Sequence, residues 1–281
     1  MSELPLDLLR QALIEDGAYR DLTTLCTVPA EAQARAVLLA RREGVIAGLA
    51  LALAAFRLLD ERVQGEAHVK DGEAVAAGQP LADLRGPARA LLSAERVALN
   101  FLGHLSGIAT LTARCVQAVA GTSVRILDTR KTTPGLRSLE KEAVRLGGGY
   151  NHRFGLSDGI LIKDNHIKAA GGLAAAIDAV RRQVPHLLKI EVECETLEEV
   201  RAAVQAGADV ILLDNMGLEQ LRQAVALVRT KAPGILLEAS GGIGPDPERL
   251  AAVAATGVDF ISLGALTHSA PSLDVALEFL A

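Results

Sequence analysis

The stretch IEVECETLEEVRAAVQAGADVILLDNMGLEQLRQAVALV, residues 190–228, contains the pattern that decides the fold. Two short runs rich in β-branched residues, Ile-Glu-Val at 190–192 and Val-Ile-Leu-Leu at 210–213, are each followed by a segment whose apolar residues recur at helical spacing. Strands that are apolar throughout and alternate with helices are typical of a parallel sheet buried on both faces. The stretch therefore predicts two consecutive strand–helix units.

The same alternation continues on both sides of this stretch. We predict strands at Val124–Leu127, Gly159–Ile162, Ile190–Val192, Val210–Leu213, Ile235–Leu237 and Phe260–Leu263, with helices near 137–146, 171–183, 196–206, 217–230 and 247–256. Six such units form an open or closed α/β barrel or a doubly wound sheet. No GxGxxG follows the first strand, so a dinucleotide-binding sheet is the weaker interpretation.

The first hundred residues do not show this strand–helix alternation. Helices are predicted at 3–15 and 45–59, a strand at 34–41, short strands within 65–86, and a helical segment from Pro87 to Ala120 in two pieces broken near Gly103–Gly107. This part of the chain is therefore expected to form a different structure from the later repeats.

Composition narrows the class of protein. The 281 residues are 50% hydrophobic but only 2% aromatic, which argues against stacking platforms for single-stranded nucleic acid. A net charge of −5 argues against nucleic-acid binding in general. Three distant cysteines without a CxxC suggest no disulfide framework or zinc site and fit a reducing, cytoplasmic setting. The acidic N-terminus does not resemble a signal peptide, and the longest apolar stretch, 45–56, is too short to span a membrane.

Ionisable or glycine-rich residues stand where the predicted strands end. They are Asp128 with Arg130 and Lys131, then Lys163, Glu193, Asp214, Ser240 with Gly241 and Gly242, and Gly264. In a parallel barrel these ends share one rim, where active sites are built. A strand must end in a polar loop anyway, but that explanation is weak for six such ends together.

A basic segment lies within this acidic chain. Residues 125–168 contain nine Lys or Arg and five acids, so they carry +4 and the remainder −9. The members near strand ends, Arg130, Lys131, Arg153 and Lys163, could converge on one anion, because Arg binds carboxylates bidentately and Lys binds phosphate as a point charge. Arg137, Lys141 and Arg145 have the spacing of a solvated helix face.

Two glycine-rich turns, at 238–244 and 262–269, follow the last two strands. Backbone amides in such turns bind phosphate, and barrels often place a phosphate site there. Glu193 and Asp214 could serve magnesium-bound pyrophosphate, ribose hydroxyls or developing positive charge, with Glu191 as a supporting residue on the same strand face. A glycosidase carboxylate pair and a Schiff-base role for Lys163 are rival uses. No hydrolase elbow, P-loop or HExxH is present.

Longer motifs give a specific resemblance. DTRKTTPGLR (128–137), GGGYNHR (147–153), LIKDNH (161–166), EVE (191–193), LDNM (213–216), EASGGI (238–243), GALTHS (264–269) and AERVALNFLGHLSG (94–107) stand in the order and spacing of quinolinate phosphoribosyltransferase. The chain resembles this family over nearly its whole length.

The resemblance implies an α/β fold with two domains. An N-terminal α/β sandwich domain would span 1–108, and an incomplete, open α/β barrel of mostly parallel strands would span 109–281. A C-terminal helix at 270–281 is expected to pack on the N-terminal domain. The resemblance also implies a homodimer or higher oligomer, in which the N-terminal domain of one subunit covers the barrel of the other.

The resemblance further implies a pentosyl transfer. Quinolinate and phosphoribosyl pyrophosphate would give nicotinate mononucleotide, carbon dioxide and pyrophosphate, with Mg²⁺, in NAD biosynthesis. The implied quinolinate residues are Arg130, His152, Arg153 and Lys163, with Arg96 from the partner subunit. The implied phosphoribosyl pyrophosphate residues are Lys131, Glu193, Asp214, Ser240, Gly241, Gly242 and Gly264, of which Lys131, Glu193 and Asp214 would be catalytic. Thr129 is a further implied substrate-binding residue. Mg²⁺ would be held mainly through the pyrophosphate, near Glu193 and Asp214.

Two rivals have other functions. A paralogous pyrophosphorylase-like protein associated with molybdate transport has similar motifs, although Thr132–Gly135 and Asn151–Arg153 favour the quinolinate enzyme. A lipoyl- or biotinyl-type carrier is suggested by the glycine-punctuated segment 66–86, where Lys70 precedes Asp71-Gly72. We expect that segment instead to be part of the N-terminal sheet.

Overall fold

The structure is a computed structural model that describes residues 5–280. Its internal contacts divide the chain into two compact units. The first comprises the chain up to Leu111, Arg145–Gly147 and the segment from Ala270, and the second comprises Thr112–Val144 and Gly148–Ser269. The division at 111/112 and the expected one at 108/109 fall within the same helix, α4 (Ala88–Ala118).

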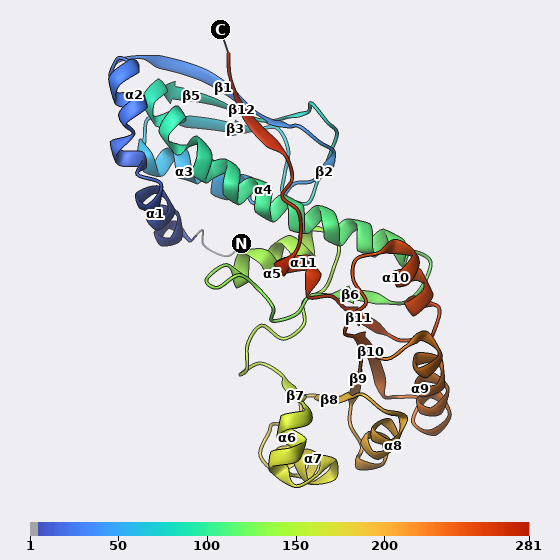
Figure 1. Cartoon of the computed structure of the whole chain (residues 1–281). Helices are drawn as coiled ribbons and strands as arrows, with labels where there is room; N and C mark the ends of the chain where they lie inside the picture. Colours follow the sequence, from blue (N-terminus) through green and yellow to red (C-terminus); the bar gives the residue numbers. More distant parts are fainter. Residues whose placement is uncertain (1–4, 281) are drawn as a thin grey trace. The chain divides into compact units, whose positions relative to one another are not determined.

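The first unit is built on an antiparallel four-stranded sheet with the order β12-β1-β5-β3 (Figure 1). Its strands are β1 (Gln33–Ala40), β3 (Gln64–Ala67), β5 (Pro80–Pro87) and β12 (Val275–Leu280), and β2 (Gly44–Val45) pairs with β4 (Ala74–Val75). The helices of this unit are α1 (Leu6–Glu15), η1 (Ala18–Arg20), α2 (Leu22–Thr27), α3 (Leu49–Leu59) and the first part of α4. In β1, Ala36, Leu38 and Ala40 are fully buried, as the alternation of a half-buried strand requires.

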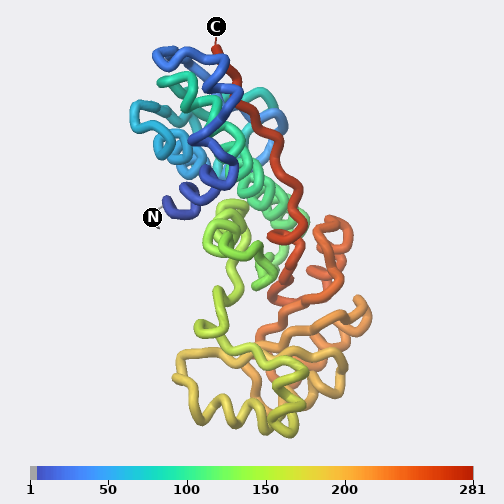
Figure 2. The backbone as a smooth tube through the Cα atoms, turned by 60° about the vertical axis from the view of Figure 1, so that its left-hand side comes forward, coloured from blue at the N-terminus to red at the C-terminus, as the bar shows by residue number. Residues whose placement is uncertain are grey.

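The C-terminal helix expected at 270–281 is wrong. Residues 275–280 form strand β12, whose register against β1 runs from Val275 opposite Ala40 to Leu280 opposite Arg35. In Figure 2 the red C-terminal segment accordingly runs beside the blue part of the first unit. Its sequence, VALEFL, has residues that suit a helix. The free edge of β1 supplies backbone partners along six residues, and this tertiary pairing outweighs the local preference. Residue 281 lies outside the described residues.

Helix α4 runs without the predicted break near Gly103–Gly107. A Cβ added at Gly103 would lie 2.9 Å from the carbonyl oxygen of Leu273. A Cβ added at Gly107 would collide with the carbonyl oxygen of Pro271. The two glycines therefore allow the C-terminal segment to pass directly against the helix. Across the described part of the chain, none of the helices combines the length and the apolar character needed to cross a bilayer.

The second unit contains a parallel sheet of six strands with the order β6-β11-β10-β9-β8-β7. They are β6 (Arg125–Leu127), β7 (Ile160–Ile162), β8 (Ile190–Cys194), β9 (Val210–Asp214), β10 (Leu236–Ser240) and β11 (Phe260–Ser262). In a closed barrel β6 would also pair with β7, whereas here these two strands are the edges of the sheet. The expected incomplete barrel is therefore confirmed.

Helices alternate with these strands as predicted. They are α5 (Arg137–Leu146), α6 (Asp164–Ala170), α7 (Leu173–Arg181), α8 (Leu197–Ala206), α9 (Leu218–Lys231), α10 (Pro247–Ala254) and the short α11 (Ala265–His268). Two helices, α6 and α11, are additional to the predicted set. Helix α6 begins directly after β7, and Gly171, with φ +82°, caps its C-terminal end. Val192, Leu213 and Leu237 show the burial expected of strands covered on both faces.

Candidate functional site

The register of the parallel sheet places the predicted polar residues on one face at the carboxyl ends of the strands. Glu191 stands beside Leu161, Glu193 beside Leu212, and Asp214 beside Ser240. Paired residues share a face and alternate residues return to it. Lys163, Glu191, Glu193, Asp214, Glu238, Ser240 and Ser262 therefore share one face. This is the rim at which α/β barrels build their sites.

At the end of β6 lies a buried ion pair that the sequence does not reveal. Lys141 Nζ lies 2.5 Å from Asp128 Oδ1, and both side chains are almost completely buried. Asn151 Nδ2 and the backbone N–H of His152 donate to the same carboxylate at 2.6 and 2.8 Å. Burial raises the pKa of Asp128, against the lowering effect of Lys141 and the other donors. The interpretation of Lys141 as a solvated helix residue is therefore wrong.

Arg137 is half-buried and makes specific contacts that its helical spacing does not predict. Its guanidinium donates to Thr132 Oγ1 at 2.9 Å and to the carbonyl oxygens of Phe154 and Arg130 at 3.2 and 3.3 Å. It thus joins the loop after β6 to the segment that carries His152 and Arg153. Sequence spacing could not show this, because the partners of Arg137 lie in loops.

Three basic side chains stand around the open edge of the barrel. Arg130 is exposed after β6, whereas Arg153 and Lys163 are half-buried. Burial lowers the pKa of Arg153, and the positive charge of Arg130 lowers it further, so the two guanidinium groups repel each other. Lys163 forms an ion pair with Glu193. A ligand with two carboxylates would relieve the repulsion between Arg130 and Arg153.

Glu193 and Asp214 lie on the same face of adjacent strands, and both are half-buried. Glu193 pairs with Lys163, and Asp214 Oδ2 accepts a hydrogen bond from Asn215 Nδ2 at 2.6 Å. Oxygen donors of this kind fit Mg²⁺, which is usually bound by one or two carboxylates together with substrate phosphates. These residues therefore fit a magnesium ion that is shared with a pyrophosphate.

The loops after β10 and β11 meet beside the loop after β6. Ser262 Oγ donates to Ser240 Oγ at 2.9 Å, and Gly241 and Gly242 have φ values of +78° and +60°. A Cβ at Gly264 would lie 2.9 Å from Lys131 Cδ. Thr129 Oγ1 accepts from the backbone N–H of Lys131 at 3.0 Å, and the carbonyl of Lys131 accepts from Thr267 Oγ1 at 2.8 Å. The expected phosphate-binding loops and Lys131 therefore lie together.

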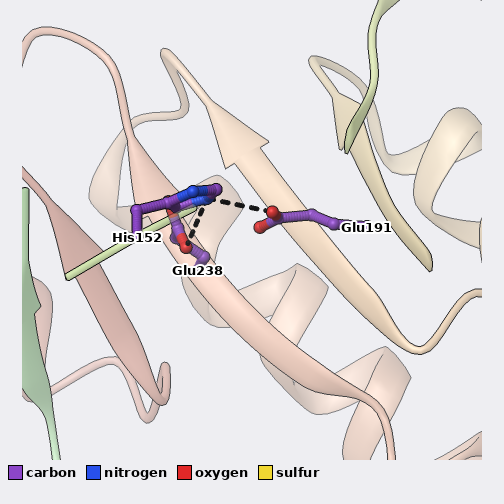
Figure 3. A group of neighbouring side chains, drawn as sticks. All are labelled: His152, Glu191 and Glu238. Carbon is purple, nitrogen blue, oxygen red and sulfur yellow. Dashed lines mark hydrogen bonds and ion pairs between the residues drawn. The ribbon is translucent and has the colours of Figure 1, made fainter. Parts of the chain in front are cut away.

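A buried cluster lies deeper on the same face (Figure 3). His152 Nε2 is 3.0 Å from Glu191 Oε2 and 3.7 Å from Glu238 Oε2. Burial raises the pKa of Glu238 to about 8, and the neighbouring Glu191 adds to this rise. Burial lowers the pKa of His152, but the hydrogen bond to Glu191 and the charge of Glu238 outweigh it and raise the pKa overall.

Within residues 5–280 these three side chains bring one histidine and two carboxylate ligand atoms within 4.8 Å of one another. The set includes an imidazole, whereas Mg²⁺ prefers oxygen ligands alone. We therefore interpret the cluster as hydrogen-bonded rather than as the magnesium site. Glu238 was not among the predicted site residues. It could have been found as an acidic residue within an otherwise apolar strand, two residues before Ser240.

Arg96 belongs to the first unit and lies on α4, where its side chain is exposed. A groove of about 710 Å³ also lies in the first unit, lined by Arg35, Arg62 and Arg85 among others. Two of these arginines are already engaged, because Arg62 pairs with Asp60 and Arg85 Nε donates to Gln64. None of the predicted site residues lines this groove.

Comparisons with known proteins point to a single family. The model of the quinolinate phosphoribosyl transferase C-terminal domain matches residues 108–278, and that of the N-terminal domain matches residues 21–106. A probable nicotinate-nucleotide pyrophosphorylase (carboxylating) of Bacillus subtilis is 49% identical over 271 residues, covering 96% of this chain and 92% of the relative. A nicotinate-nucleotide pyrophosphorylase (carboxylating) of Mycobacterium leprae is 46% identical over 278 residues, covering 97% and 96%.

A similar match is found among solved structures. The crystal structure of NadC from Streptococcus pyogenes superposes with a TM-score of 0.90 at 42% identity and covers all of both chains. That of a nicotinate-nucleotide pyrophosphorylase from Ehrlichia chaffeensis superposes with a TM-score of 0.92 at 37% identity, again over all of both chains.

Proposed function

The chain belongs to the quinolinate phosphoribosyl transferase family, and we propose that the carboxyl ends of its six parallel strands form the active site. Its activity is that of the family, a pentosyl transfer in NAD biosynthesis. Quinolinate and phosphoribosyl pyrophosphate give nicotinate mononucleotide, carbon dioxide and pyrophosphate.

The quinolinate pocket is formed by Arg130, Arg153 and Lys163, with His152 behind them. The observation that supports it is that exposed Arg130 lies near enough to half-buried Arg153 for its charge to lower the pKa of Arg153. Two guanidinium groups that destabilise each other bind a dianion more strongly than either would alone, because the ligand neutralises both. The pocket is therefore matched to a small dicarboxylate. Arg96 would complete it from the partner subunit of a homodimer.

The phosphoribosyl pyrophosphate site lies over the other strand ends. Ser240, Gly241, Gly242 and Gly264 bind the 5′-phosphate through loop amides and a hydroxyl. Gly241 and Gly242 have positive φ, and Gly264 stands directly before helix α11. Thr129 and Lys131 serve the pyrophosphate beside Gly264. Glu193 and Asp214 would hold Mg²⁺ together with the pyrophosphate, and the ion, when bound, neutralises charge on the leaving group.

Catalysis then relies on positioning and electrostatics. As the ribose–pyrophosphate bond breaks, positive charge develops on the sugar, and the carboxylates of Glu193 and Asp214 stabilise it. The pyridine nitrogen attacks from a fixed pose, so that orientation supplies much of the rate. The resulting positive ring nitrogen withdraws electrons from the adjacent carbon, which eases loss of the neighbouring carboxylate. No side chain needs to form a covalent intermediate.

The site experiment compares substrates and variants. Arg130→Ala and Arg153→Ala should raise the KM for quinolinate and lower kcat while leaving the fold intact, and nicotinate, which lacks the carboxylate next to nitrogen, should be a poor substrate. Steady-state kinetics with far-UV circular dichroism as the folding control would measure this. Equal turnover of nicotinate and quinolinate would contradict the pocket.

Two further proposals concern the setting of the enzyme. The molybdate-associated paralogue is disfavoured, because the relatives at 46% and 49% identity carry the name nicotinate-nucleotide pyrophosphorylase (carboxylating). A cytoplasmic location is consistent with three unpaired cysteines, of which Cys115 and Cys194 are buried and Cys26 is exposed.

A further inference from the structure

The buried cluster of His152, Glu191 and Glu238 has no stated role in the transfer reaction. We propose that Glu191 and Glu238 are positioning residues that hold the Nε2 proton of His152 and, through Nδ1 of the same ring, fix the backbone of Arg153 in the dicarboxylate pocket. This inference rests on the proposed function and deepens its account of the quinolinate site.

The contacts of the imidazole define its orientation. Its Nε2 faces the two carboxylates at 3.0 and 3.7 Å, and its Nδ1 accepts a hydrogen bond of 2.7 Å from the backbone N–H of Arg153. An Nδ1 that accepts carries no proton, so the proton of the neutral ring sits on Nε2 and is donated to Glu191. The carboxylates thus set the tautomer that lets Nδ1 hold Arg153.

The two acids come from strands on either side of β9 (Figure 3). Glu191 lies on β8 and Glu238 on β10, with Leu212 of β9 directly beside Glu238 in the register. Both are inward-facing members of regular strands, which hold their carboxylates rigidly. The His152 ring is therefore clamped by two elements of the scaffold and not by its own loop.

Stability does not explain this arrangement. The side chains of Glu191 and Glu238 are 9% and 3% exposed, and one oxygen of each, Oε1, has no hydrogen-bond partner. Buried carboxylates are costly unless fully paired, and apolar residues of similar size would be tolerated at least as well. Two such acids converging on one ring at a binding face indicate a functional role.

The rest of the segment is fixed by independent contacts. Asp128 accepts from the N–H of His152, Lys141 Nζ donates to the carbonyl of His152 at 3.0 Å, and Arg153 Nη1 donates to the carbonyl of Gly159 at 2.9 Å. These contacts anchor His152 and the Arg153 side chain. The carboxylate pair then controls the orientation and the tautomer of the His152 ring and, through Nδ1, the backbone N–H of Arg153. Their loss should therefore weaken substrate binding without unfolding the segment.

The test uses the isosteric variants Glu238→Gln and Glu191→Gln in the full-length enzyme. Each should raise the KM for quinolinate by about 10-fold, with a much smaller change in the KM for phosphoribosyl pyrophosphate. Glu191→Gln should also lower the pKa of His152, followed by NMR and assigned with a His152→Asn variant, because the hydrogen bond from the ring to the Glu191 carboxylate raises that pKa. Asp259→Asn is the matched control. This carboxylate accepts from Arg229 and from the N–H of Leu237 at the opposite end of the sheet, so its loss affects stability and not the quinolinate KM.

One measurement needs no variant. The ¹⁵N shifts of His152 in the wild-type enzyme should show a proton on Nε2 and a bare Nδ1 in the neutral ring. A neutral ring protonated on Nδ1, or an unchanged quinolinate KM in both glutamine variants of an active enzyme, would overturn the inference. A wild-type enzyme that makes no nicotinate mononucleotide would instead overturn the proposed function, and the two failures are thus distinguishable.

Discussion

Lys141 shows how strongly one buried residue can organise the loops of the site. Its ammonium group lies between Asp128 and the carbonyl of His152, and nothing but protein surrounds it. Lys141→Met keeps the volume but leaves Asp128 buried without its cation, and breaking such a pair costs about 3–5 kcal/mol. Urea denaturation should show this loss. Arg201→Met, which removes an exposed pair with Glu198, should cost under about 1 kcal/mol, and equal losses in the two variants would contradict the account.

Glu238 links the site to the pH dependence of stability. Burial raises its pKa from 4.5 to about 8, so the folded protein holds this proton more tightly than the unfolded chain. The resulting stabilisation is complete below pH 4.5 and is lost as the pH rises to about 8. Glu238→Gln should therefore flatten the decline in unfolding free energy across this window. Parallel curves for the two proteins in urea titrations at pH 5, 6.5 and 8 would refute it.

At the scale of elements, Gly107 determines how α4 meets the C-terminal segment. On an exposed helix face Gly→Ala usually stabilises by up to about 1 kcal/mol. Here the added methyl would collide with the carbonyl of Pro271, so Gly107→Ala should destabilise by about 1–3 kcal/mol. Thermal unfolding of this variant is best compared with Gln117→Ala on an exposed part of the same helix. A gain in stability at Gly107 would show that the segment does not pack there.

Some helices and strands could be predicted from the local sequence, and others could not. The six parallel strands were predictable because short, mostly apolar runs alternate with helical segments, as a parallel sheet covered on both faces requires. Strand β12 and the unbroken α4 were not, because each depends on a distant partner: β1 for the first, and residues 271–273 for the second. Local propensity contains no information about such partners.

The candidate site divides in the same way. Lys163, Glu193, Asp214 and Ser240 could be placed because strand ends share one rim of a barrel. The roles of Lys141 and Glu238 could not, because their meaning comes from burial beside Asp128 and His152. Arg96 was marked by the family motif alone and not by its position on a helix.

At the scale of the whole molecule, the proposed homodimer makes a prediction about shared sites. In the proposed homodimer each active site combines Lys163 of one subunit with Arg96 of its partner. Arg96→Ala therefore damages the partner's site, whereas Lys163→Ala damages the site of its own subunit. A heterodimer then contains one site with both defects and one intact site. Random mixing of the two inactive variants by co-refolding should restore about a quarter of the wild-type activity. Each variant refolded alone serves as the control, and no recovery on mixing would place Arg96 outside the partner's site.

The most direct test of the central claim is the stoichiometry of the reaction. Wild-type protein is incubated with quinolinate, phosphoribosyl pyrophosphate and Mg²⁺, and nicotinate mononucleotide and carbon dioxide are quantified together. We expect the two products in a one-to-one ratio, with neither formed when phosphoribosyl pyrophosphate is omitted. Absence of the mononucleotide, or its formation without equivalent carbon dioxide, would contradict the account.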